Sequence, residues 1–282
     1  MDIYLVDGIG PFFRDIKKER VNWSKIPFNA LKLGGVGHRA QFDRIAEDMN
    51  AFARQVSEVG YNCVSLDDVA HLAPDVWYED EINRKIEIFR QEFKRLFAIL
   101  NKYNLGVYLT MDILSFTPKL RENVGNDLGR AILFMKRQID LLLTDFPEVK
   151  GIIMRIGESD GLDVKGEFRS ELIIRSPGKA NRIIRELLPL FEHHKRHLIL
   201  RNWTVGAYSV GDFLWHRRTT RRILQDIDSP CFILSMKYGE SDFFRYLPLN
   251  KLFFKTHVKK IVELQARREY EGCGEYPSFI GW

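Results

Sequence analysis

The sequence has few of the features that mark disulfide-bonded, metal-binding or membrane-spanning proteins. Its three cysteines, Cys63, Cys231 and Cys273, are odd in number and show no CxxC spacing, which argues against a disulfide framework and against a zinc site. No run of about 18 apolar residues is present, so a spanning helix is excluded. The first seven residues lack the basic-then-apolar order of a signal peptide. We therefore expect a cytoplasmic protein that needs no metal, no other cofactor and no membrane.

The chain also has only a small excess of charge of one sign. Lysine and arginine number 43 against 38 aspartates and glutamates, a net charge of +5, which is too small to indicate nucleic acid as a partner. Hydrophobic residues make up 45% and charged residues 29%, values that exclude disorder, collagen-like repeats and coiled coil. Aromatic residues reach 12%, enough for a thick core and for a cleft that stacks flat sugar rings.

One unit repeats along the chain: a short apolar run that ends in polar residues or glycine, followed by a helical stretch. Branched residues fill both faces of several runs, which is typical of strands covered on both sides in a parallel sheet. The eight runs are 27–34, 61–68, 105–113, 149–158, 197–206, 231–239, 260–269 and 276–282. Apolar residues spaced by three and four predict helices over 41–59, 81–101 and 126–146. A helix over 177–194 is predicted from Ser176 as its N-cap and Pro177 at its first position, and shorter helices are expected over 212–226 and 249–255.

Eight strands with intervening helices predict an α/β fold, a (β/α)8 barrel of the TIM type, as one catalytic domain over residues 1–282. The eighth run ends at Trp282, so either the last outer helix is missing or the chain is a piece of a longer protein. Residues 1–26 are expected to form an N-terminal extension that packs on the barrel. Within it, residues 3–6 form an extra strand or cover the bottom of the barrel.

Charged and aromatic side chains follow the predicted strands, where the loops of such a barrel meet at one mouth. The second run ends in Asp67 and Asp68, with His71 beyond, and the third ends in Asp112. The other residues at strand ends combine carboxylates, cations and rings: Arg155, Glu158, Arg201, Trp203, Lys237, Tyr238, Asp242, Glu269 and Trp282. This mixture suits a carbohydrate substrate with an acidic group.

Glycoside hydrolysis needs a carboxylic acid that protonates the leaving oxygen and a carboxylate on the opposite face of the sugar. Both must be held on rigid elements across the cleft. Glu158, after the fourth run, and Glu269, in the seventh, would lie on opposite sides of an eight-stranded ring. The two carboxylates are therefore candidates for this pair.

Three islands of sequence carry a resemblance to a known family. Residues 237–243 read Lys-Tyr-Gly-Glu-Ser-Asp-Phe, residues 265–272 read Gln-Ala-Arg-Arg-Glu-Tyr-Glu-Gly, and Glu158-Ser-Asp-Gly follows the fourth run. Together with Arg201 after the fifth run, these segments resemble the α-glucuronidases of the glycoside hydrolases. The resemblance covers roughly residues 149–272, and the flanking domains of that family have no counterpart here.

The resemblance implies an inverting hydrolase of a uronic-acid-containing glycan. Glu158 would be the general acid, and Asp242 with Glu269 would activate the water. Arg155 and Arg201 would bind the uronate carboxylate as bidentate forks, with Lys237 as a further contact. The remaining substrate-binding candidates are Asp67, Asp68, Trp203, Tyr238 and Trp282.

Other interpretations remain open. In a retaining enzyme Glu158 would be acid/base, Glu269 the nucleophile and Asp242 a supporting group; a carboxyl separation of about 5–5.5 Å indicates retention and about 6.5–9.5 Å inversion. The barrel could also bind sugar without catalysis, or act as a metal-dependent isomerase or lyase. Asp67 and Asp68 are as well suited to holding loops, and His71 to packing or capping. The basic run 216–222 is expected to be a solvated helix surface.

Overall fold

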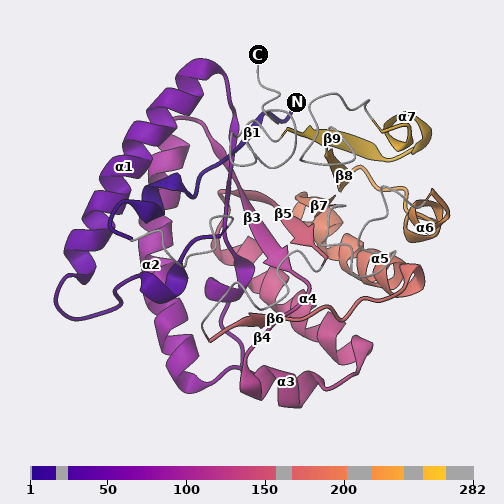
Figure 1. Cartoon of the computed structure of the whole chain (residues 1–282), viewed down its shortest axis with the longest axis horizontal. Coiled ribbons are helices and arrows are strands. Elements are labelled where there is room, and N and C mark those ends of the chain that lie inside the picture. The colour runs from indigo at the N-terminus through magenta and orange to yellow at the C-terminus, as the bar shows by residue number, and fades with distance from the viewer. Residues whose placement is uncertain (1, 17–24, 157–166, 202–216, 238–249, 265–282) are drawn as a thin grey trace, which may run out of the picture.

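A computed structural model describes residues 2–16, 25–156, 167–201, 217–237 and 250–264, and shows seven parallel strands in a curled sheet (Figure 1). The strands lie in the order β1 (Leu5–Asp7), β2 (Cys63–Leu66), β3 (Gly106–Asp112), β5 (Val149–Arg155), β7 (His197–Arg201), β8 (Phe232–Lys237) and β9 (Lys259–Glu263). A separate antiparallel pair joins β4 (Ser115–Phe116) to β6 (Arg169–Ser170).

The strand order explains why the sheet curls. Each strand of the large sheet lies beside the strand that precedes it in the chain, so every crossover runs in the same direction. Because such crossovers are right-handed, they place all the helices on one face, and the sheet bends into a half-barrel. The helices are α1 (His38–Val59), α2 (Asp80–Lys102), α3 (Pro118–Val124), α4 (Leu128–Asp145), α5 (Pro177–His194), α6 (Arg217–Ile223) and α7 (Leu252–Lys255). The predicted α/β barrel class is confirmed.

The outer face of the sheet is mostly apolar, although Lys260 of β9 lies on it in register with Leu234 of β8. Side chains alternate across a strand, and the outward members join the helices in the main core. On β8, for example, Phe232, Leu234 and Met236 are all fully buried. This layer fixes the register, since a slip of one residue would turn the set to the other face.

The inner face changes character along its height. Its lower layer is a second, smaller apolar cluster, formed by Cys63, Tyr108, Ile153, Ile199 and Ile233. The next inward positions toward the carboxyl ends are polar or charged: Thr110, Asp112, Arg155, Arg201, Ser235, Lys237 and Glu263. The apolar layer therefore closes the barrel from below, and the charges lie at the mouth.

The first predicted strand was wrong. Within residues 27–34 the chain forms a 3-10 helix, η3 (Phe28–Ala30), and Gly34 and Gly35 have φ values of +69° and +67°, which an extended strand does not allow. The first strand is instead β1 (Leu5–Asp7), the extra strand that was one expectation for residues 3–6. The next six runs each contain a strand, and the eighth, 276–282, lies outside the described residues.

The helix predictions are confirmed with small shifts in their ends. Helix α5 begins as the sequence indicates, with the Ser176 side chain accepting a hydrogen bond from the Lys179 backbone and Pro177 in the first turn. The predicted helix 212–226 is observed as α6 over Arg217–Ile223, and residues 212–216 lie outside the described part. The helix predicted over residues 249–255 is observed over Leu252–Lys255, as α7.

Candidate active site

Asp112 lies at the end of β3 and holds charged groups from several parts of the chain. Its Oδ1 accepts a hydrogen bond from Arg155 Nε at 2.8 Å, across the β3–β5 register that pairs the two residues. Its Oδ2 accepts from Ser170 Oγ at 2.7 Å and pairs with Lys25 Nζ. All four side chains are buried. Burial alone would raise the pKa of Asp112, but Arg155 and Lys25 outweigh it and hold the pKa below its usual range.

Asp67 directly follows β2 and completes this group. It accepts a hydrogen bond from the backbone nitrogen of Ile26 at 2.6 Å and another from the Thr110 hydroxyl, and lies 3.6 Å from Arg155 Nη2. Burial raises the pKa of Asp67 despite the attraction of Arg155. The same guanidinium thus faces two carboxyl groups whose pKa values are shifted in opposite directions, raised for Asp67 by burial and lowered for Asp112 by its close ion pairs. We call Lys25, Asp67, Thr110, Asp112, Arg155 and Ser170 the β2–β5 cluster.

Asp68 faces a different partner. It accepts hydrogen bonds from the backbone nitrogen of His71 at 3.0 Å and from its ring Nδ1 at 2.8 Å. The His71 ring stacks on Phe28 with centroids 3.7 Å apart. Burial would raise the pKa of Asp68, but His71 and Lys25 hold it low. Both residues take the packing and capping contacts that were one of the two expectations for them.

A second charged group spans β7, β8 and β9. Arg201 Nε donates to Glu263 Oε2 at 2.7 Å, and Arg201 Nη2 pairs with Glu263 Oε1. Their side chains are 19% and 22% exposed, whereas Lys237 on the strand between them is buried. Burial would raise the pKa of Glu263, but Arg201 and Lys237 lower it. We call Arg201, Lys237 and Glu263 the β7–β9 cluster.

The sheet register brings the two clusters together. Arg155 and Arg201 are directly paired across β5 and β7, so two guanidinium groups emerge side by side on the inner face. Arg155 turns to Asp112 on one neighbouring strand, and Arg201 turns to Glu263 on the other side. With Lys237, this forms a cationic row on three consecutive strands at the barrel mouth. Such a row attracts an anion.

The sequence placed six of these residues at strand ends and missed four others. Arg155, Arg201, Lys237, Asp67, Asp68 and Asp112 all lie at strand ends, as predicted. Lys25, Thr110, Ser170 and Glu263 were not among the predicted site residues. Glu263 had a signal, because it is the last residue of β9, but the predicted run continued to residue 269. Nothing near Lys25 in the sequence indicates that it reaches β3.

The three predicted catalytic residues, Glu158, Asp242 and Glu269, lie outside the described residues, as do Trp203, Tyr238 and Trp282. Their roles therefore stay predictions. Within the described ranges, no group of three or more histidine, cysteine, aspartate or glutamate side chains could hold a metal ion. The helices of the described part include none that is long and apolar enough to cross a membrane.

The chain resembles several solved structures at low identity. One is a GH20 catalytic module of a pneumococcal exo-β-D-N-acetylglucosaminidase (12% identity, TM-score 0.43, 69% of this chain and 56% of that one). Another is a GH138 enzyme that targets pectin rhamnogalacturonan II (13%, 0.44, 71% and 23%). A third is a maltogenic α-amylase from Thermotoga neapolitana (12%, 0.38, 83% and 65%).

These neighbours are glycoside hydrolases of different families. The chain spans 56% of the first of them and 23% of the second. No protein-family model matches the sequence, and no curated protein sequence does. The architecture described above rests on the strand order of this chain.

Proposed function

We propose that this chain is a glycoside hydrolase that cleaves a uronic-acid-containing glycan, in the manner of an inverting α-glucuronidase. The observation that carries the proposal is the cationic row of Arg155, Arg201 and Lys237 at the carboxyl ends of β5, β7 and β8. This is the end of a barrel where substrates bind. A uronate differs from a neutral sugar by one carboxylate, which such a row would hold.

Arg155 and Arg201 have different roles in the proposed site. Arg155 is 3% exposed, and its guanidinium contacts both Asp112 and Asp67, so its role is to hold the mouth in shape beside Arg201. Arg201 is the more exposed of the two and is paired with Ser235 on the next strand, two residues before Lys237. We therefore assign the uronate contact chiefly to Arg201.

The proposed chemistry uses carboxylates that follow these cations closely in the chain. Glu158 comes three residues after Arg155, and Asp242 five residues after Lys237. Both follow strands that end at the same mouth, and Glu269 follows β9 in the same sense. Glu158 would protonate the leaving oxygen, while Asp242 and Glu269 would remove a proton from the attacking water. Hydrolysis of each glycosidic bond consumes one water molecule and needs no other reactant.

The test compares matched 4-nitrophenyl α-glycosides of glucuronic acid and glucose. We expect hydrolysis of the glucuronide and little of the glucoside. Arg201→Gln should raise KM for the glucuronide about tenfold or more, since a charged hydrogen bond contributes about 1.5–3 kcal/mol, and leave the glucoside rate unchanged. Glu158→Gln should remove most of kcat on the intact oligosaccharide. Equal rates on the two glycosides would overturn the uronate assignment.

The stereochemistry separates the two mechanisms. Proton NMR of the first product should show the β-anomer from an α-glucuronide if the enzyme inverts. An initial α-anomer would instead favour the retaining alternative, with Glu158 as acid/base and Glu269 as nucleophile. Calorimetric binding of glucuronate without hydrolysis of any glycoside would leave a sugar-binding barrel and contradict the proposed activity.

A further inference from the structure

Exposed cations gather on the outer wall of the barrel, away from the mouth. In α6, Arg218, Arg221 and Arg222 are exposed, whereas Thr219 and Thr220 are buried. Positions separated by three and four residues share one side of a helix. Within residues 218–222 the three arginines therefore point outward together, and the two threonines face the core.

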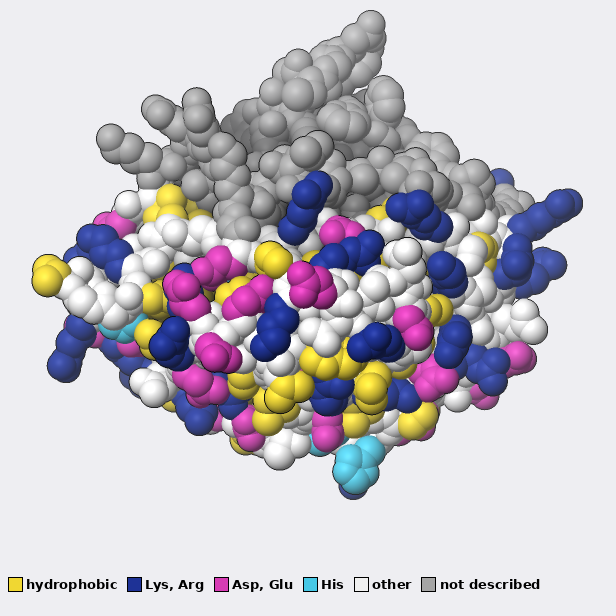
Figure 2. Space-filling view, turned by 90° about the horizontal axis from the view of Figure 1, so that it is seen from below, with side chains coloured by type: hydrophobic (Ala, Val, Ile, Leu, Met, Phe, Trp, Pro, Cys, Tyr) yellow, Lys and Arg dark blue, Asp and Glu magenta, His cyan; other side chains and the backbone are white. Residues whose placement is uncertain are grey.

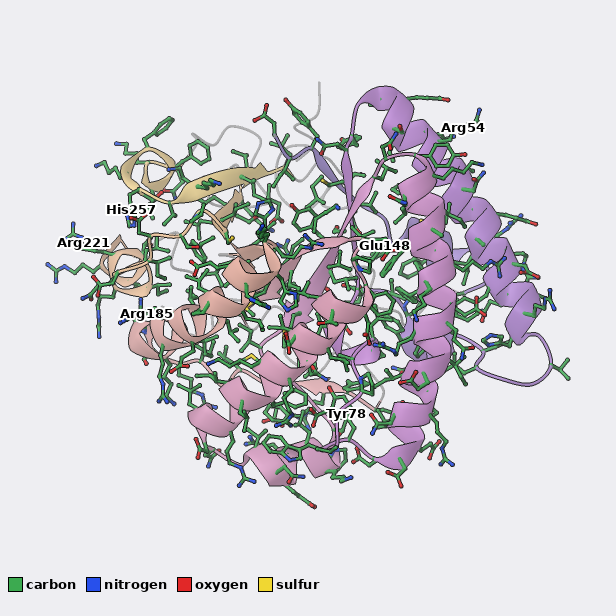
Figure 3. All side chains as sticks on the ribbon, turned by 180° about the vertical axis from the view of Figure 1, so that it is seen from behind. Arg54, Tyr78, Glu148, Arg185, Arg221 and His257 are labelled. Atoms are coloured by element: carbon green, nitrogen blue, oxygen red, sulfur yellow. The ribbon has the colours of Figure 1, made fainter. Side chains whose placement is uncertain are left out.

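Helix α5 extends this set. Its exposed cations, Lys179, Arg182 and Arg185, recur every third residue, about 4.5 Å apart along the axis. The two helices are tied together by Asn181, whose Nδ2 donates to the carbonyl oxygens of Ile223 at 2.9 Å and Gln225 at 2.7 Å. Figure 3 shows Arg185 and Arg221 on neighbouring helices, both pointing outward. We call Lys179, Arg182, Arg185, Arg218, Arg221 and Arg222 the α5–α6 basic face.

This face differs from the rest of the surface in how its charges are paired. Around α3 and α4 both signs are interspersed (Figure 2), as in the pairs Lys136–Glu186 at 2.7 Å and Arg137–Asp75 at 2.8 Å. Over the described ranges, no salt bridge joins a cation of the α5–α6 basic face to a carboxylate. Glu186 of α5 pairs with Lys136 of α4 and is also attracted by Arg182, both of which lower its pKa, whereas Asp226 and Asp228 lie beyond the last turn of α6. The excess of positive charge on the two adjacent helices creates a field that a polyanion would relieve.

We propose that the α5–α6 basic face binds a linear acidic polysaccharide, the polymer form of the substrate class proposed above, on which this inference rests. A polyuronate carries one carboxylate on each sugar, and guanidinium groups match carboxylates in shape and charge. Among the described residues of α5 and α6, Phe191 is buried and no phenylalanine, tyrosine or tryptophan ring is exposed for nucleic-acid bases to stack on. Neither α5 nor α6 carries an exposed large hydrophobic residue, which membrane insertion would require.

Fluorescence anisotropy of the full chain with labelled polygalacturonate tests the proposal. The double variant Arg185→Gln/Arg221→Gln should weaken binding about tenfold at low salt, because two charge contacts are lost. The matched control, Arg54→Gln/Arg84→Gln, removes two exposed helical arginines elsewhere and should change binding by less than about twofold, since only the net charge falls. Labelled dextran, a neutral polymer, should not bind.

The outcomes separate this surface from the proposed activity. If both double variants weaken polygalacturonate binding equally, the proposal that the α5–α6 basic face binds the polymer is wrong. It is also wrong if duplex DNA or phosphatidylserine vesicles bind to this face more tightly than polygalacturonate does. Hydrolysis of the small glucuronide should be the same in all variants. If no glycoside is hydrolysed but polymer binding still depends on Arg185 and Arg221, the proposed hydrolase activity is wrong and the proposed binding surface is supported. If the glucuronide is hydrolysed but polymer binding does not depend on Arg185 and Arg221, the hydrolase activity is supported and the binding surface is wrong.

Discussion

The β2–β5 and β7–β9 clusters use the same chemistry at the same height of the barrel, but they differ in access to water. In the first, Lys25, Asp112 and Arg155 are each less than a tenth exposed, and Asp112 has three side-chain donors. In the second, Arg201 and Glu263 are about one-fifth exposed. A closed ionic network is costly to disturb and serves to hold the mouth in shape, whereas a partly hydrated pair can exchange one anion for another. The closed β2–β5 cluster is therefore expected to support the mouth, and the proposed uronate contact falls to the more open β7–β9 cluster.

Acidification acts on both clusters at once and should have the largest effect. Asp68, Asp112 and Glu263 have pKa values held below their usual range, so their contribution is complete above about pH 4 and is lost as the pH falls further. Asp67, with its raised pKa, contributes in the opposite direction. We expect the free energy of unfolding, measured by urea denaturation, to drop below pH 4. The drop should be less steep in Asp112→Asn, and an identical slope would contradict the ionic role of Asp112.

Removing one carboxylate from the closed cluster comes next. Asp112→Asn leaves Lys25 and Arg155 buried without their main counter-charge, which should cost about 3–5 kcal/mol of unfolding free energy at pH 7. Asp140→Asn is the control, because Asp140 is 58% exposed and pairs with His194 at the surface. It should cost less than about 1 kcal/mol. Equal effects of the two changes would remove the distinction between buried and exposed pairs here.

The same change in the open cluster should cost less. Glu263→Gln removes the partner of Arg201, but water can reach this guanidinium, so we expect a loss of about 1–2 kcal/mol, between the values for exposed and buried pairs. The variant should also bind glucuronate more tightly, because Arg201 would lose a competing carboxylate. Calorimetry would show this gain. A loss as large as that of Asp112→Asn would mean that both clusters are structural.

The smallest effect is expected from a neutral donor. Thr110→Val keeps the shape of the side chain and removes the hydroxyl that donates to Asp67, at a cost of about 1 kcal/mol. It should also raise the pKa of Asp67 further, a shift that NMR titration of its carboxyl carbon can follow. Thr256→Val is the control: the Thr256 hydroxyl donates to the backbone oxygen of Leu252, the first residue of α7, and its removal should leave the Asp67 titration unchanged.

Strand and helix periodicity predicted most of this architecture, because an inward and an outward residue alternate on every strand and apolar residues recur along each long helix. The failure at residues 27–34 has a local cause. An apolar run there resembles a strand, yet Phe28 is buried by packing on His71 in a 3-10 turn, and periodicity alone does not separate these cases. The three-residue strand β1 lies where the sequence left two possibilities open, an extra strand or a cover for the bottom of the barrel.

The sequence by itself determined which residues would reach the mouth, since the end of each parallel strand is a local property. Arg155, Arg201, Lys237, Asp67 and Asp68 were found in this way. Only the tertiary structure decided what each one contacts: Arg155 is held by Asp112, Arg201 by Glu263, and Asp112 by a lysine 87 residues away in the chain. These partners come from different strands and from a segment outside the sheet, so they come into contact only when the sheet curls. Their spacing along the chain therefore does not predict these contacts.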